Sequence, residues 1–249
     1  MFEDPVFIVA ANLSVAVLIR IMKPNLLSAA LLAIVLIGST GYLGTHHGSQ
    51  VVSAVHRGRD AALTWTGHPP TWPPEKNRTY PDLELLDQDG NVTRLSDFKG
   101  KVILIEPIGI PCQACVAFSG GHEFGAFEGI EPQADLESIE FYAKQYGHVR
   151  LDDYRIVRVQ LLLFNQDMQA PTQAEAKAWA DHFRMRQAGK EIVLVGTASM
   201  ATKASRDLIP GFQLIDKHFI LRADSTGQTP ADDLYTKLLP QIRKLIDED

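Results

Sequence analysis

The residues with the clearest chemical potential are the only two cysteines, Cys112 and Cys115, spaced as C-x-x-C in a chain of 249 residues. Two cysteines cannot build a disulfide framework, and alone they cannot supply the four ligands of a structural zinc site. A pair at this spacing can form and open one disulfide by exchange, in which a thiolate attacks a disulfide sulfur. The same pair could also be a structural disulfide or two buried core thiols.

The residues before the pair predict how it is held. Residues 102–105 are a short, β-branched apolar run that ends at Glu106, which indicates a buried strand, and we expect Pro107 to interrupt its end. The cysteines then fall in the turn that opens a helix. At a helix N-terminus, unpaired backbone N–H groups and the helix dipole favour a thiolate. The sequence therefore predicts a dithiol suited to exchange chemistry at neutral pH.

The composition is that of a globular chain, with 45% hydrophobic and 22% charged residues. This content is enough to build an ordinary core. The net charge is −6 and no cluster of Lys or Arg occurs, which argues against a nucleic-acid-binding surface.

Residues 1–45 have a different character, which predicts a membrane anchor of one or two transmembrane helices. Two apolar runs, 6–22 and 26–43, are separated by a short polar break, and the second carries no charge. Arg20 and Lys23 lie near the break, so the positive-inside rule places it in the cytoplasm and everything after residue 43 outside. A biological start at Met22 would make this an uncleaved signal anchor. The alternative is a buried hairpin of a soluble protein.

Residues 46–75 are predicted to be a juxtamembrane segment and a Pro-rich linker, with the folded domain spanning 76–249. Residues 49–65 could form an amphipathic helix near the membrane surface. His46 and His47 could ligate haem or a metal, or could simply be solvated. Five prolines within residues 67–81 indicate a semi-rigid linker.

The domain alternates predicted strands and helices, which indicates an α/β fold of three layers with parallel central strands and an antiparallel hairpin edge. The last helix is expected to start at Thr229-Pro230, and Thr172 with Glu175 forms a predicted capping box. The predicted strands are 81–87 with 92–95, 102–105, 155–164, 191–195, and 212–215 with 219–223, and the predicted helices are 114–118, 132–147, 172–185 and the C-terminal helix.

Two segments resemble a known family. Residues 81–115 contain the hairpin, the L-S-D-F-K-G-K turn, the strand and the C-x-x-C, and residues 209–216, I-P-G-F-Q-L-I-D, look like a proline-led strand. Together they are similar to the TlpA/ResA-like membrane-anchored thiol–disulfide oxidoreductases of the thioredoxin superfamily. The resemblance covers roughly residues 79–249. It implies a thioredoxin-like fold with an N-terminal β-hairpin.

The resemblance also implies catalytic roles. Cys112 would be the nucleophile and Cys115 the resolving thiol. Glu106 would be a buried acid that passes a proton to or from Cys115. Pro210 would be cis and would place the backbone of Ile209 beside Cys112 to pair with substrate. The alternatives are a partly exposed strand-end acid at Glu106 and an ordinary trans proline at Pro210.

This chain departs from the family pattern near the cysteines. Gln113-Ala114 separates them where many relatives have a proline before the second cysteine, and Pro111 stands where tryptophan is usual. We expect Pro111, Gln113, Ala114 and Ile209 to form the substrate surface. Residues 118–147 read as an insertion that could act as a lid or docking surface.

A copper site is the main alternative chemistry. His122, Glu123 and His218 could join the cysteine pair in a site of the Sco type. Sco proteins, however, use C-x-x-x-C with a distant histidine, and the spacing here differs.

The predicted function is a membrane-tethered thiol–disulfide oxidoreductase on the periplasmic, extracytoplasmic side of the cytoplasmic membrane. Its partners would be protein thiols and disulfides, including a membrane donor or acceptor thiol protein, and it would use no cofactor or metal beyond the Cys112–Cys115 disulfide. A reductant role as in cytochrome c maturation is implied by the resemblance. The rival hypotheses are a copper-binding or chaperone module that uses the cysteines without redox turnover, and a tethered scaffold whose insertion binds a partner.

Overall fold

A computed structural model describes residues 72–185 and 191–248, which fall within one compact unit, Pro69–Asp249. The two predicted membrane spans, the predicted helix at 49–65, His46 and His47 lie outside the described residues. Within 72–185 and 191–248, no helix has the length and apolar character needed to cross a bilayer.

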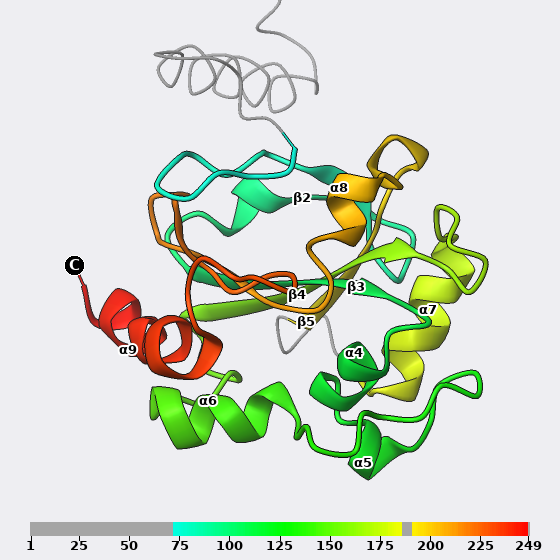
Figure 1. Ribbon diagram of the computed structural model, residues 1–249. Helices are drawn as coiled ribbons and strands as arrows, with labels where there is room; N and C mark the ends of the chain where they lie inside the picture. The colour runs from blue at the N-terminus through cyan, green and yellow to red at the C-terminus, as the bar shows by residue number, and fades with distance from the viewer. Residues whose placement is uncertain (1–71, 186–190, 249) are drawn as a thin grey trace, which may run out of the picture. The chain divides into compact units, whose positions relative to one another are not determined.

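The domain is organised around a five-stranded mixed sheet in the order β5-β4-β3-β6-β7 (Figure 1). The strands are β3 (Val102–Gly109), β4 (Ile156–Phe164), β5 (Glu191–Val195), β6 (Gln213–Ile215) and β7 (Leu221–Asp224). β3, β4 and β5 pair in parallel, whereas β6 is antiparallel to both β3 and β7. The predicted parallel centre and antiparallel hairpin edge are therefore confirmed.

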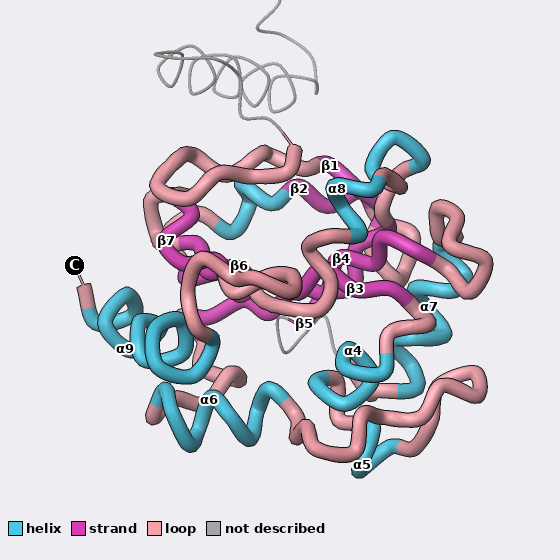
Figure 2. Tube along the Cα trace, in the orientation of Figure 1, coloured by secondary structure: helices cyan, strands magenta, loops and turns pink. Residues whose placement is uncertain are grey.

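One face of this sheet carries most of the helices, as Figure 2 shows for α4, α6, α7 and α9. The chain steps from β3 to β4 and from β4 to β5 in the same direction, so crossovers of one hand place their helices on one face. These elements are α4 (Gln113–Phe118), α5 (Gly121–Phe124), α6 (Ile139–Gly147), α7 (Gln173–His182), the π-turn η4 (Leu234–Leu238) and α9 (Leu239–Asp247).

The opposite face is covered by the predicted N-terminal hairpin and by the connection that returns from β5 to β6. Apolar side chains from the sheet, the hairpin and this connection form one cluster there. The elements are β1 (Glu84–Leu86), β2 (Val92–Arg94), η1 (Leu95–Phe98), η3 (Ala198–Met200) and α8 (Lys203–Arg206).

The sequence of β3 is almost continuously apolar because both of its faces are buried. Ile103 and Ile105 pack into the cluster under the hairpin, while Val102 and Leu104 pack under α6 and α9, so both faces are buried. Glu106 has the same parity as Leu104 and is therefore directed under the helices. A carboxyl at such a position needs partners.

The expected interruption at Pro107 is wrong, because β3 continues to Gly109. Pairing with β6 ends at Ile105, whereas pairing with β4 continues through Pro107 opposite Leu161. Proline lacks a backbone N–H, and a strand tolerates it where one side of the ladder is unpaired.

Two predicted helix starts are also wrong. α6 begins seven residues after Pro132, because the Ser138 side chain accepts the N–H of Phe141 and caps the helix there. The C-terminal helix begins after Asp233, whose carboxylate accepts the N–H groups of Tyr235 and Thr236, and not at Thr229-Pro230. The capping box of Thr172 and Glu175 at the start of α7 is confirmed.

The described domain includes residues predicted to be linker. The Trp72 indole packs against the cluster under the hairpin, and its Nε1 donates a 2.8 Å hydrogen bond to Ser205 Oγ on α8. The Pro-rich segment is thus tied to the domain at least four residues before the predicted boundary at 76.

Candidate active site

Cys112 and Cys115 lie at the junction between β3 and α4, as predicted, and are joined by a disulfide. Cys112 is the N-cap residue of α4, and its Sγ accepts a 3.1 Å hydrogen bond from the backbone N–H of Cys115. Cys112 is partly exposed, whereas Cys115 is fully buried. Only the Cys112 sulfur is therefore accessible to a partner.

The residues between and before the cysteines differ in what they offer to a partner. Gln113 is exposed and Pro111 is partly buried at the surface. Ala114, in contrast, is buried against the cluster under α6 and α9. The prediction that Ala114 contributes to the substrate surface is wrong for its side chain, because the second position of α4 faces the core.

The second wall of the site comes from the loop before β6. The Ile209–Pro210 peptide bond is cis, as the resemblance implies. A methyl group added at Gly109 would lie 3.7 Å from Ile209 Cδ1, so this loop lies directly against the end of β3. Ile209 and Cys112 pack against the same apolar cluster, which brings the proline loop and the cysteine pair to one end of the sheet.

Glu106 is buried beneath this end of the sheet, with 1% of its surface exposed. Its Oε2 accepts a 2.7 Å hydrogen bond from Gln160 Nε2. Burial raises the pKa of the Glu106 carboxyl to about 7, outweighing Arg158 and Gln160, which both lower it. The alternative of a partly exposed strand-end acid is therefore wrong.

Gln160 joins three elements around Glu106. Its Nε2 also donates to Ser119 Oγ at 2.6 Å, and its Oε1 accepts the indole N–H of Trp179 at 2.8 Å. Ser119 ends α4, and its backbone N–H donates to the carbonyl of Cys115 at 3.0 Å. The carboxyl is thus connected to the cysteine helix through one glutamine and one serine.

Arg158 is the second charged residue of this buried layer, and it is 7% exposed. Its Nη2 lies 4.0 Å from Glu106 Oε2, while its Nη1 lies 3.4 Å from Glu191 Oε1. Sequence reasoning missed both Arg158 and Gln160. The available signal was two polar residues at alternating positions in the otherwise apolar β4 run.

Only part of the predicted insertion lies beside the cysteines. The N–H of Gln133 donates to the Gln113 carbonyl at 3.1 Å, and Ile130 and Leu136 pack against the clusters that contact Cys112. Residues 139–147 instead form α6, whose Ile139 and Ala143 belong to the core beneath α9. The reading of all of 118–147 as an insertion is corrected accordingly.

The residues proposed for a copper site do not converge. His122 Nε2 lies 3.2 Å from the Gln133 carbonyl on the loop beside α5. His218 lies in the β6–β7 turn, next to Lys217, whose carbonyl accepts the N–H of Gly100. This turn adjoins the start of β3, while Cys112 follows its end. In the described part of the chain, no three His, Cys, Asp or Glu side chains are grouped to hold a metal.

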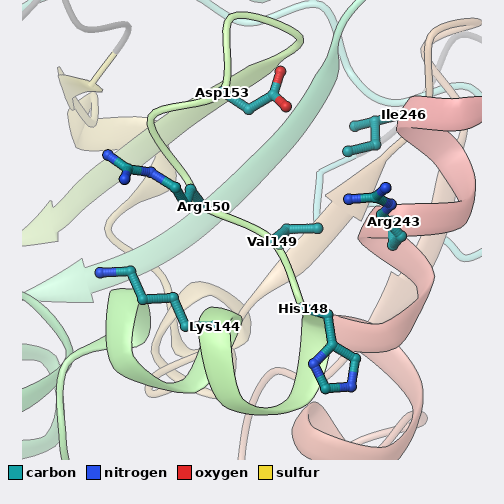
Figure 3. Close-up of a pocket in the computed structure, with 7 residues that line it drawn as sticks. All are labelled: Lys144, His148, Val149, Arg150, Asp153, Arg243 and Ile246. Carbon is teal, nitrogen blue, oxygen red and sulfur yellow. The ribbon is translucent and has the colours of Figure 1, made fainter.

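A surface pocket of about 440 Å³ lies apart from this site, between the end of α6, the loop that follows it and α9 (Figure 3). In the figure, Lys144 and Arg150 extend to the same side while His148 points away from both. Arg150 pairs with Asp152 and Arg243 with Asp247, so neighbouring acids offset these cations. The lining residues are Lys144, His148, Val149, Arg150, Asp153, Arg243 and Ile246.

The arrangement at the sheet end is that of a thioredoxin-like fold: a C-x-x-C at the N-terminus of a helix, a cis-proline loop beside it, and a mixed sheet with an antiparallel pair of strands, β6 and β7, at one edge. A disulfide in this position can be opened by a thiolate that reaches Cys112. The buried carboxyl supplies a group that can hold or release a proton near neutral pH.

No protein-family model and no curated protein matches this chain. Solved structures are similar to it at low identity. The thioredoxin domain of a thiol-disulfide oxidoreductase from Bacteroides vulgatus is 14% identical and covers 68% of this chain and 98% of its own, with a TM-score of 0.42. A SCO1/SenC family lipoprotein from Bacillus anthracis is 16% identical and covers 69% of this chain and 96% of its own, with a TM-score of 0.44. Copper-bound ScoI from Arabidopsis thaliana is 14% identical and covers 66% of this chain and 97% of its own, with a TM-score of 0.41.

Proposed function

We propose that this protein is a thiol–disulfide oxidoreductase that exchanges the Cys112–Cys115 pair with protein thiols and disulfides. The observation that carries the proposal is the asymmetry of the pair. A partly exposed Cys112 at a helix N-terminus is bonded to a fully buried Cys115. A purely structural disulfide has no need for an accessible sulfur or for an ionisable carboxyl behind it.

In the reduced protein, the Cys112 thiolate attacks a substrate disulfide. A new Cys112–substrate S–S bond forms, and the first substrate thiolate leaves. Cys115 then loses its proton and attacks Cys112 Sγ, which forms the Cys112–Cys115 disulfide and releases the second substrate thiolate. The protein is oxidised by two electrons and the substrate is reduced by two. The reverse sequence oxidises a substrate dithiol.

Glu106 is the proposed acceptor of the Cys115 proton. A carboxyl whose pKa is about 7 is partly ionised at neutral pH, so it can take a proton when the mixed disulfide resolves and return it in the reverse step. The contacts through Gln160 and Ser119 connect it to the cysteine helix. The backbone of Ile209, beside the cysteines, is the proposed pairing site for an extended substrate segment.

The location is also part of the proposal. The apolar runs within residues 1–45 and the positive charges between them favour a membrane-tethered protein whose domain faces the extracytoplasmic side. A disulfide persists in that compartment. A membrane thiol protein would then reduce the pair with its dithiol or oxidise the pair with its disulfide. Cytochrome c maturation is one process that uses such a reductant.

The test is trapping with single cysteine variants of the full-length chain. Cys115→Ser should accumulate a mixed disulfide between Cys112 and a substrate, because the resolving thiol is missing. Cys112→Ser, the matched control, should trap none. Full exchange activity in both variants would refute the proposal. Stoichiometric copper retention that is lost in Cys112→Ser, without redox turnover, would instead favour the copper-binding alternative.

A further inference from the structure

Trp179 belongs to the same buried apolar cluster as Cys115, and it lies one hydrogen bond from Gln160, the residue that holds Glu106. Its indole is fully buried, and its Nε1 lies 2.8 Å from Gln160 Oε1. Phe127, from the loop beside the site, packs edge-on to the indole at 4.9 Å between centroids, and Phe183 packs at 4.7 Å. These two rings hold the indole in one orientation.

The direction of the Gln160 amide follows from donor chemistry. An indole N–H can only donate, so it requires the amide oxygen of Gln160 on its side. The NH₂ group must then face the other way, where its two N–H bonds reach Glu106 Oε2 at 2.7 Å and Ser119 Oγ at 2.6 Å. A flipped amide would place its NH₂ group against the indole N–H, so that two donors would face each other. It would also present its oxygen to the Glu106 carboxylate.

We propose that Trp179 is a positioning residue for Glu106: its indole N–H fixes the Gln160 amide so that an N–H is always presented to the Glu106 carboxylate. This inference builds on the proposed role of Glu106 as a proton acceptor. It assigns to α7 a part in setting when that carboxyl gives up its proton.

Among the groups around Glu106, Gln160 is the one that donates a close hydrogen bond to the carboxylate in the described part of the chain. From β4, Arg158 approaches to 4.0 Å, and from β5, Glu191 offsets Arg158 at 3.4 Å. At the end of α4, Ser119 shares the Gln160 amide with Glu106. The sheet-facing sides of α6 and α9 are apolar, with Ile139, Ala143 and Ile242 buried there. The Gln160 N–H lowers the pKa of Glu106, so losing its fixed orientation should raise that pKa.

The test measures the Glu106 titration directly in the disulfide form of the full-length chain. The probe is the Cδ chemical shift of ¹³C-labelled glutamate, with the Glu106 signal identified by its absence in Glu106→Gln. Trp179→Phe keeps an aromatic ring and removes the N–H, and it should raise the midpoint by about one pH unit. Trp72→Phe is the matched control, because it removes an indole N–H bonded to Ser205 on the opposite face and should leave the midpoint unchanged.

Two further variants keep the inference falsifiable. Replacing Trp179 by benzothienyl-alanine retains the bicyclic shape with sulfur in place of N–H, and it should give the same upward shift even if Trp179→Phe does not fold. Gln160→Met should also raise the midpoint, and combining it with Trp179→Phe should add nothing, because Trp179 acts through Gln160. A wild-type midpoint in either Trp179 variant would overturn the inference. Because no turnover is needed, this outcome is distinct from failure of the proposed function, which the cysteine variants test.

Discussion

Glu106 and Gln160 lie directly opposite each other across the parallel β3–β4 ladder, and the Gln160 amide donates a 2.7 Å hydrogen bond to the Glu106 carboxylate. The pair is buried beneath the helix that carries the cysteines. A carboxyl held by one neutral donor, with Arg158 at 4.0 Å, is kept ionisable near neutral pH without being locked in its charged form. We expect Glu106 and the loop that carries the cis Pro210 to affect both the stability of the domain and the kinetics of disulfide exchange.

The first prediction concerns stability against pH. Folding raises the pKa of Glu106 from 4.5 to about 7. Its contribution to the free energy of unfolding is therefore fully present below pH 4.5 and is lost as pH rises through 7. In the wild type this loss should be about 3 kcal/mol, because each tenfold change in the protonation equilibrium corresponds to about 1.4 kcal/mol. Glu106→Gln should lack this component of the pH dependence. The measurement is urea unfolding of the disulfide form from pH 4 to 8, and equal slopes in both proteins would contradict it.

The second prediction concerns the rate of resolution. If Glu106 accepts the Cys115 proton, Glu106→Gln should slow closure of the mixed disulfide at pH 7 by about 10²-fold, the lower range for loss of a general base. The rate should recover at alkaline pH, where hydroxide removes the thiol proton. Acid-quenched single turnovers of the reduced protein with a disulfide peptide measure this step. An unchanged rate at pH 7 would leave Glu106 with a structural role only.

The third prediction concerns the loop behind the cis proline. Gly211 has φ +147°, and a methyl group there would lie 2.4 Å from the Ser225 carbonyl oxygen. Gly211→Ala should therefore destabilise the domain by more than about 2 kcal/mol, because both backbone strain and overlap must be relieved. It should also weaken exchange with protein substrates more than with a small disulfide, since the Ile209 backbone would shift.

Gly129→Ala is the matched control for this variant. Gly129 has φ +82° but no atom within 4 Å of an added methyl group, so only backbone strain of roughly 1 kcal/mol is expected. Thermal unfolding, and exchange assays with a protein substrate and with a small disulfide, distinguish the two variants. Equal losses in the two variants would refute the steric argument.

The fourth prediction tests the start of α7. Thr172 Oγ1 accepts the Glu175 N–H, and the Glu175 carboxylate accepts the Thr172 N–H at 2.6 Å. Thr172→Ala should lower the free energy of unfolding by about 1 kcal/mol, the usual cost of losing an N-cap. The Glu106 midpoint should not move, because Trp179 lies two turns further along the helix. Urea unfolding and the ¹³C titration of Glu106 measure both outcomes.

Much of the local structure follows from the sequence. The β-branched run before the cysteines, the Thr172 capping box and the apolar face of α7 are local signals, and each forms where it was expected. One failure, the predicted start of α6, occurred where two local signals competed. Ser138 rather than Pro132 starts α6, since a side-chain oxygen satisfies a free N–H that a nearby proline leaves unpaired.

By itself, the sequence predicted a pair of cysteines at a helix N-terminus, with an acid in the preceding strand, and both features are found. The tertiary structure alone decided what surrounds that acid. Gln160 is 54 residues from Glu106, and Trp179 is 19 residues further on. Their meeting depends on the β3–β4 register, in which a shift of one residue would send Gln160 to the hairpin face. Local propensity specifies strands and helices, but only non-local packing sets that register.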